Sequence, residues 1–153
     1  YLYPEGFDPE TGEWLPGSDP LLADLPRPQA PSPTTRGYMH SLVAACAVRP
    51  YAVGAAAVLP CFWIYAEVGR ALAASAAQVL AADPNHPYAQ WVTTYDAPEF
   101  QESASRAREL VDEAAVHAGE RERAAMATAF TVATRFELLF WDTALNPQPW
   151  PAA

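Results

Sequence analysis

Two side chains of this 153-residue sequence combine chemical reactivity with apolar surroundings. Cys61 directly follows Pro60 in an apolar, aromatic segment that covers residues 59–69. Glu137 interrupts a helical stripe whose other members are apolar, namely Met126, Phe130, Ala133, Phe140 and Ala144. A thiol and a carboxylate that face one cavity can perform nucleophilic catalysis assisted by a general acid/base. We therefore take Cys61 and Glu137 as the candidate catalytic pair.

Each member of this pair also has a structural alternative. A free cysteine usually packs as a small hydrophobic residue, which applies to Cys61 and still more to Cys46. A buried carboxylate needs a partner, so Glu137 either forms an ion pair or serves a site. The candidate ion-pair partners are Arg49, Arg70 and Arg135. No histidine is paired with Cys61 in the sequence, so the group that would generate a thiolate is not identified.

Aromatic residues recur at helical spacing around the candidate pair. They are Tyr38, Tyr65, Tyr95, Trp63, Trp91 and Trp141. Packing in the core is the default interpretation of such residues. Several of them around a polar pair also suggest a stacking pocket for a flat ring. Tyr65 lies one helical turn after Cys61 and is therefore a candidate to hydrogen-bond either Cys61 or Glu137.

Composition excludes several classes of partner. A net charge of −9 argues against nucleic acid and against an anionic membrane surface. The two cysteines provide neither a disulfide framework nor zinc-ligand spacing, so we expect a cytoplasmic protein without metal or cofactor. The longest apolar run, residues 52–66, is short and interrupted by Gly54 and Pro60, which predicts no membrane span. The first residue is Tyr1 rather than Met, so we expect a fragment or a processed product.

The elements that must position the candidate residues are helices, which predicts an all-α class. Prolines make residues 1–33 an irregular segment, and residues 34–153 form the helical domain. We expect helices over residues 34–49, 51–82, 88–95, 97–118 and 120–145, the first capped by Thr34 or Thr35. Asp96 and Glu99 form a capping-box pattern before the fourth helix. Pro60 predicts a kink before Cys61. The predicted inward face of the second helix comprises Cys61, Tyr65, Val68, Leu72, Ser75 and Val79.

Three segments, in order, resemble the TenA/thiaminase II family. They are AVLPCFWIYAEVG at 57–69, HPYAQWVTTY at 86–95 and RFELLFWD at 135–142. The resemblance covers about residues 30–151, the C-terminal two-thirds of the family's pattern. It implies a haem-oxygenase-like helical bundle that binds neither haem nor metal and is usually a homotetramer, so we expect a homo-oligomer.

The resemblance also implies an activity: hydrolysis of aminopyrimidines to hydroxymethyl-pyrimidine in thiamine salvage, and less efficiently of thiamine itself. By position, Cys61 resembles the nucleophile that adds to the pyrimidine ring, and Glu137 resembles the acid/base that handles the ring-nitrogen proton. Tyr38, Tyr65 and Tyr95 match tyrosines that line the family's substrate pocket. The implied partner is therefore a small-molecule pyrimidine.

The sequence departs from the family at its front. Family members carry additional N-terminal helices with a substrate-binding aspartate and a stacking aromatic, which residues 1–30 do not resemble. We therefore expect a bundle truncated at its N-terminus, with an apolar face left for an oligomer contact or a complementing chain. Two alternatives to the enzyme follow: a non-catalytic pyrimidine-binding or scaffold protein, and a subunit that needs a separate N-terminal partner.

Overall fold

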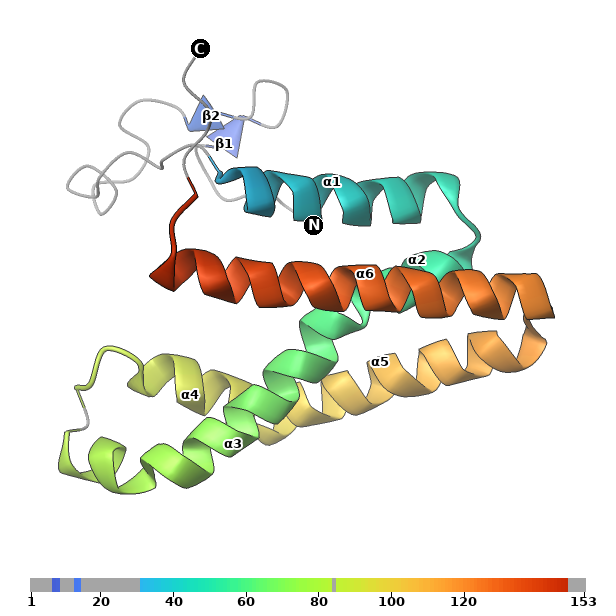
Figure 1. Ribbon diagram of the computed structural model, residues 1–153. Helices are drawn as coiled ribbons and strands as arrows, with labels where there is room; N and C mark the ends of the chain where they lie inside the picture. The colour runs from blue at the N-terminus through green and yellow to red at the C-terminus, as the bar shows by residue number, and fades with distance from the viewer. Residues whose placement is uncertain (1–6, 9–12, 15–30, 84, 149–153) are drawn as a thin grey trace, which may run out of the picture. The chain divides into compact units, whose positions relative to one another are not determined.

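The computed structural model describes residues 7–8, 13–14, 31–83 and 85–148, which belong to two compact units, 1–30 and 31–153 (Figure 1). In the first unit, β1 (Phe7–Asp8) pairs antiparallel with β2 (Glu13–Trp14). The sequence predicted no strand there, and this short pair corrects that prediction. Neither strand contains a proline, so both can supply the backbone N–H groups that a ladder needs. The rest of the predicted irregular segment lies outside the described residues, apart from residues 31–33.

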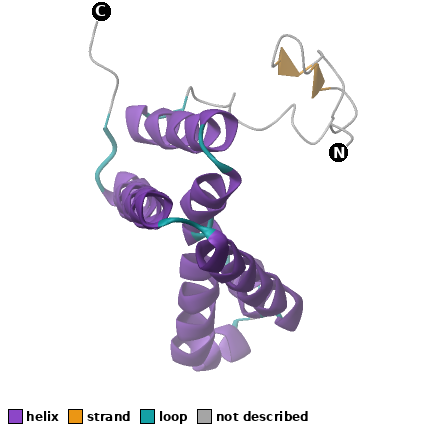
Figure 2. Ribbon diagram, turned by 90° about the vertical axis from the view of Figure 1, so that its right-hand side faces the viewer, coloured by secondary structure: helices purple, strands orange, loops and turns teal. Residues whose placement is uncertain are grey.

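The described part of the second unit consists of helices joined by short connections (Figure 1, Figure 2). They are α1 (Pro33–Val48), α2 (Tyr51–Val58), α3 (Pro60–Ala82), α4 (Ala89–Asp96), α5 (Pro98–His117) and α6 (Glu120–Leu145). The predicted all-α class is confirmed.

Prolines and small polar residues set the helix boundaries. Ser32 caps α1, because its hydroxyl accepts a hydrogen bond of 3.1 Å from the Thr35 N–H; the predicted caps Thr34 and Thr35 lie inside the helix. The predicted cap Asp96 is also wrong, since the N-cap of α5 is Ala97 and carries no side-chain cap bond. Pro98 restricts the residue before it to extended backbone, which places the cap at residue 97.

The predicted kink before Cys61 is a break between two helices. α2 ends at Val58 and α3 begins at Pro60, which has no N–H to donate to the carbonyl of Ala56. After the break α3 runs in a different direction from α2 (Figure 1). As a result, α2 packs mainly against α6 and α1, whereas α3 packs mainly against α4 and α5. Cys61 lies immediately after the point where the two directions diverge.

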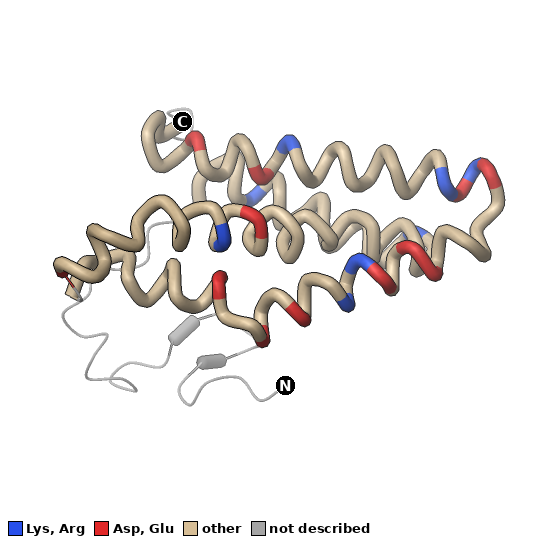
Figure 3. The backbone as a smooth tube through the Cα atoms, turned by 90° about the horizontal axis from the view of Figure 1, so that it is seen from below, with Lys and Arg blue, Asp and Glu red and all other residues tan. Residues whose placement is uncertain are grey.

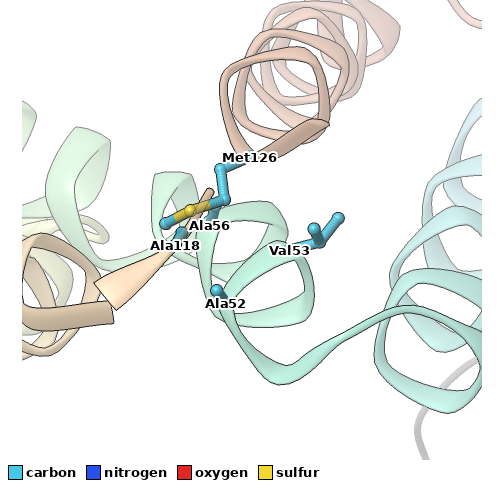
Figure 4. Close-up of a cluster of buried hydrophobic side chains, with 5 residues drawn as sticks. All are labelled: Ala52, Val53, Ala56, Ala118 and Met126. Carbon is cyan, nitrogen blue, oxygen red and sulfur yellow. The ribbon is translucent and has the colours of Figure 1, made fainter. Parts of the chain in front are cut away.

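The buried core lies where α2 meets the end of α5 and the first half of α6. It consists of Ala52, Val53, Ala56, Ala118 and Met126 (Figure 4). The three alanines let the helices approach closely, and Met126 fills the space between them. This core fixes α6, and therefore Glu137, relative to α2 and the beginning of α3.

The predicted inward face of α3 is only partly buried. Cys61, Tyr65 and Val68 are half-buried, but Leu72, Ser75 and Val79 are exposed. This corrects the prediction for the second half of the helix, where these three side chains are left uncovered. Two further residues, Phe140 of the α6 stripe and Cys46 of α1, are also exposed.

Charged residues are distributed unevenly over the helices. α2 carries none and α3 carries only Glu67 and Arg70, whereas α5 and the first turn of α6 carry many (Figure 3). Residues 51–82, taken together, are therefore long and apolar enough by length and composition to cross a membrane, contrary to expectation. Half of the most apolar segment within this range is buried inside the protein, as is usual for core helices. The break at Pro60 also divides the range into two helices.

Candidate active site

Three side chains from three helices meet in what we call the Tyr38 cluster: Tyr38 from α1, Cys61 from α3 and Glu137 from α6. The Tyr38 hydroxyl donates a hydrogen bond of 2.8 Å to Glu137 Oε1. The same hydroxyl lies 3.2 Å from Cys61 Sγ in a second hydrogen bond. A tyrosine has one hydroxyl proton, so with Tyr38 donating to Glu137, the thiol of Cys61 donates to Tyr38. The cluster is thus a continuous path for a proton from the thiol to the carboxylate.

The cluster is rigidly held on the side of Tyr38. This residue is buried, and its ring stacks on Phe136 with centroids 5.4 Å apart and an interplanar angle of 8°. Cys61 lies in the first turn of α3, where free N–H groups would favour a thiolate. The carbonyl of Leu59 already accepts bonds from the N–H groups of Phe62 and Trp63. Tyr38 is therefore the main polar partner of the thiol.

Glu137 is almost completely buried, with 2% of its surface exposed. The predicted arginine partners do not pair with it: in the described part of the chain Arg70 pairs with Glu67 at 3.2 Å, and no salt bridge includes Glu137. Its partner is the hydroxyl of Tyr38, which bonds only Oε1. The other carboxylate oxygen, Oε2, has no hydrogen-bond partner among the described residues. The same residues contain no group of three or more His, Cys, Asp or Glu that could hold a metal ion.

Burial controls the acidity of the cluster. Desolvation raises the pKa of the Cys61 thiol. Once the thiol is deprotonated, the Tyr38 hydroxyl can donate a hydrogen bond to the thiolate, which lowers this pKa, whereas the charge of Glu137 raises it, and the net pKa is above the usual value. Burial, followed by the bonds to Cys61 and Glu137, also raises the pKa of the Tyr38 hydroxyl well above its ordinary range. The resting cluster therefore holds a neutral thiol and a neutral phenol, and the thiol needs a proton acceptor to become nucleophilic.

The other two predicted pocket tyrosines lie in a separate aromatic cluster. Tyr65, Trp91, Tyr95 and Trp141 pack together, with the Tyr65 ring 5.0 Å from Tyr95 and 5.6 Å from Trp141. Tyr65 makes no hydrogen bond to Cys61 or Glu137 within the described residues, which corrects the expectation above; Tyr38 takes that role. Desolvation, and then the charge of Glu137, raises the pKa of Tyr65 to about 12.

Trp63 lies outside both clusters. Its ring packs against Phe130 with centroids 5.9 Å apart. The guanidinium of Arg108 lies 4.3 Å from the ring centroid of Trp63, a cation–π contact. Trp63 therefore links α3 to α5 and α6 rather than lining a site.

Two residues that the sequence did not single out hold Tyr95 in place. Gly69 lets α4 approach α3 so closely that a Cβ atom at this position would lie 2.6 Å from Tyr95 Cβ. The amide of Gln101 donates hydrogen bonds to the carbonyls of Tyr95, at 2.8 Å, and Ala66, at 3.0 Å. A glycine in the middle of an amphipathic helix was the available signal for this close approach.

Glu137 also lines a cavity of about 460 Å³ between α3 and α6. The other lining residues are Ile64, Val68, Thr134, Arg135, Leu138 and Trp141. Tyr38, Cys61, Tyr65 and Tyr95 do not line it. The cavity borders the aromatic cluster at Trp141, which lines the cavity and contacts Tyr65. Thr134 is a further residue that the sequence did not indicate.

Comparison with known proteins adds the following similarities. The model of the TENA/THI-4/PQQC family matches residues 23–147. The chain is 33% identical over 121 residues to the aminopyrimidine aminohydrolase of Bacillus subtilis, covering 78% of this chain and 48% of that protein. It is 36% identical over 96 residues to the aminopyrimidine aminohydrolase of Halalkalibacterium halodurans, covering 62% of this chain and 41% of that protein. It is 38% identical over 121 residues to the thiamine biosynthesis multifunctional protein ThiED of Corynebacterium efficiens, covering 79% of this chain and 15% of that protein. The chain thus spans half or less of the length of these relatives.

Proposed function

The chain belongs to the TENA/THI-4/PQQC family, and on this premise we propose that it hydrolyses an aminopyrimidine to hydroxymethyl-pyrimidine in thiamine salvage. The names of the relatives from Bacillus subtilis and Halalkalibacterium halodurans support the reaction class. The observation that carries the proposal is the Tyr38 cluster, in which one hydroxyl joins a thiol to a buried carboxylate. Such a path supplies the proton acceptor that a cysteine without a histidine requires.

In the proposed reaction, the proton of Cys61 moves to the Tyr38 oxygen while the Tyr38 proton moves to Glu137 Oε1. The thiolate adds to a carbon of the pyrimidine ring, and Glu137 delivers the proton to a ring nitrogen. When Glu137 takes that proton back, the ring electrons expel the protonated amine from the exocyclic methylene as a neutral amine. Water adds to the methylene and releases a proton, and loss of the thiolate restores the aromatic ring.

Tyr65 and Tyr95 are proposed to bind the flat ring of the substrate. Both belong to a cluster of tilted aromatic rings, and such rings bind a planar heteroaromatic molecule by stacking and edge contacts. The Tyr65 hydroxyl stays protonated at neutral pH because its pKa is about 12, so it can donate a hydrogen bond to a ring nitrogen or a hydroxymethyl group.

The test is turnover of aminomethyl-pyrimidine, with hydroxymethyl-pyrimidine measured by chromatography and mass spectrometry. Replacement of the nucleophile in Cys61→Ser is expected to reduce turnover to background. Cys46→Ser is the matched control, because Cys46 is exposed on α1 and should be dispensable. Turnover that survives Cys61→Ser at the wild-type rate would contradict the mechanism.

A second candidate is a non-catalytic pyrimidine-binding protein, or a subunit that is completed by a separate N-terminal partner. It is favoured by apolar residues on α6 that remain exposed, Leu138 to 70% and Leu145 to 84%. Calorimetric binding of aminomethyl-pyrimidine without any product would favour this candidate over the enzyme.

Homo-oligomeric assembly and a cytoplasmic location remain predictions. An oligomer would bury part of the exposed apolar surface of α6, which is the reason to expect it. Light scattering of the purified chain measures the assembly, and a monomer at micromolar concentration would contradict it.

A further inference from the structure

Two buried side-chain oxygens in the described part of the chain have no hydrogen-bond partner: Thr134 Oγ1 and Glu137 Oε2. They come from residues three positions apart on α6, and both residues line the cavity of about 460 Å³. Buried polar groups are nearly always hydrogen-bonded, and leaving one unpaired costs free energy. Two such atoms beside one cavity therefore require an explanation.

Thr134 differs from the other threonines of α6 and α4. Thr128 and Thr131 each donate to the carbonyl four residues earlier, at 2.9 and 2.8 Å. Thr93 and Thr94 do the same in α4. This internal bond is the usual way for a helical threonine to satisfy its hydroxyl. Thr134 lacks it, although its position inside α6 offers the same carbonyl geometry, so its hydroxyl remains available to another partner.

The other residues that line the cavity indicate which kind of ligand would fit it. Ile64, Val68, Leu138 and Trp141 provide apolar and aromatic surface, and the volume exceeds that of a small heteroaromatic ring. The two unpaired oxygens both accept hydrogen bonds, and Glu137 is charged when ionised. The surface is thus complementary to a flat apolar molecule that carries an N–H donor.

We propose that Thr134 is a specificity-determining residue whose hydroxyl, together with Glu137 Oε2, accepts hydrogen bonds from the amino group of an aminopyrimidine in this cavity. The identity of the ligand rests on the proposed function. Glu137 then serves two partners: Oε1 bonds Tyr38 in the proton path, and Oε2 recognises the ligand. Both oxygens are shielded from solvent, so the ligand reaches them through a small side-chain rotation, for which Thr134 has staggered rotamers.

The experiment compares two probes by calorimetry on the full chain: hydroxymethyl-aminopyrimidine, and the same pyrimidine without its amino group. Thr134→Val removes the hydroxyl and keeps the shape, and Thr134→Ser keeps the hydroxyl. We expect Thr134→Val to weaken binding of the amino probe about three- to tenfold, which corresponds to one neutral hydrogen bond. Binding of the amino-free probe should be unchanged, and Thr134→Ser should retain wild-type affinity for the amino probe.

Thr131→Val is the matched control, since Thr131 satisfies its own hydroxyl within α6 and does not line the cavity. Thermal unfolding separates recognition from folding: Thr134→Val removes an unpaired buried hydroxyl and should unfold at the same or a higher temperature than the wild type. The proposal would be overturned if Thr134→Val lost equal affinity for both probes or kept its affinity for the amino probe. It would also be overturned if the wild type did not bind the amino probe. Binding with this pattern but without turnover would support it while contradicting the proposed hydrolysis.

Discussion

Replacing Gly69 by alanine should push α4 away from α3. The added Cβ would lie 2.6 Å from Tyr95 Cβ and 2.8 Å from Tyr95 O, far inside ordinary van der Waals contact. Restoring contact at about 3.5 Å requires a shift of roughly 1 Å, and the obstacle includes backbone atoms that cannot rotate away. Overpacking of this kind costs about 1–3 kcal/mol, whereas alanine gains about 1 kcal/mol in helix propensity. Given the backbone clash, we expect a net destabilisation of about 1–2 kcal/mol.

Gly37→Ala provides the matched control in another helix. Its Cβ would lie 3.4 Å from the ring of Phe136, which is close to ordinary contact with a side chain that can adjust. We expect this variant to be stabilised by up to about 1 kcal/mol, because the gain in helix propensity is not cancelled by a clash. The two glycine variants should therefore change stability in opposite directions.

The assay is urea unfolding followed by circular dichroism, with the near-ultraviolet signal as a separate readout of the aromatic cluster. Displacement of Tyr95 should alter the near-ultraviolet spectrum of Gly69→Ala, weaken binding of a pyrimidine ligand, and leave the helical signal intact. A Gly69→Ala protein as stable as Gly37→Ala, with an unchanged near-ultraviolet spectrum, would refute the described contact between α3 and α4.

Two further predictions concern acidity. Tyr38→Phe removes the hydroxyl whose hydrogen bond to the Cys61 thiolate lowers the pKa of this residue, so alkylation of Cys61 at neutral pH should slow about three- to tenfold. Glu137→Gln removes a charge that raises the same pKa and should speed alkylation. Site-specific mass spectrometry measures both rates, and a change in the same direction in both variants would contradict the assignment. The folded-state pKa of Tyr65 is raised from 10.0 to about 12, so its contribution to stability is complete below pH 10 and is lost as the pH rises to about 12. Between pH 10 and 12, the urea concentration at the midpoint of unfolding should fall less steeply with pH in Tyr65→Phe than in the wild type. Identical slopes in the two proteins would show that Tyr65 does not titrate in this way.

Local chemistry made much of the fold predictable. Prolines cannot continue a helix ladder, so Pro60 and Pro98 marked real boundaries. Helical periodicity identified Met126, Ala133 and Glu137 as buried positions of α6 but also included Phe140, which is exposed. The caps were less predictable, because Pro98 moved the cap from Asp96 to Ala97. Periodicity also assigned a face to α3 without showing what covers it, so Leu72 and Val79 were expected inside and are exposed.

The sequence singled out Tyr38, Cys61 and Glu137, which the structure brings together, but it did not indicate the hydrogen bonds that join them. Cys61 and Glu137 stood out because reactive groups interrupted apolar stripes. The bridging position of Tyr38 depends on how α1 docks against α6 and α3, which the spacing of residues within one helix does not specify. For the same reason Tyr65, one turn from Cys61, looked like its partner, and the partner is Tyr38. The role of Gly69 and the unpaired hydroxyl of Thr134 likewise arise from contacts between helices.

The hydrogen bond from Tyr38 to Glu137 joins residues 99 positions apart in the chain. It exists only when α1 and α6, the first and last helices among the described residues, are docked together. Because proteins open locally with less free energy than global unfolding requires, undocking of α1 alone would remove Tyr38 and leave most of the helical structure intact. In such a partly open state Cys61 loses its contact with both Tyr38 and the proton path. The hydrogen bonding of this thiol therefore depends on the docking of α1, and a local opening that leaves the other helices in place is enough to remove it.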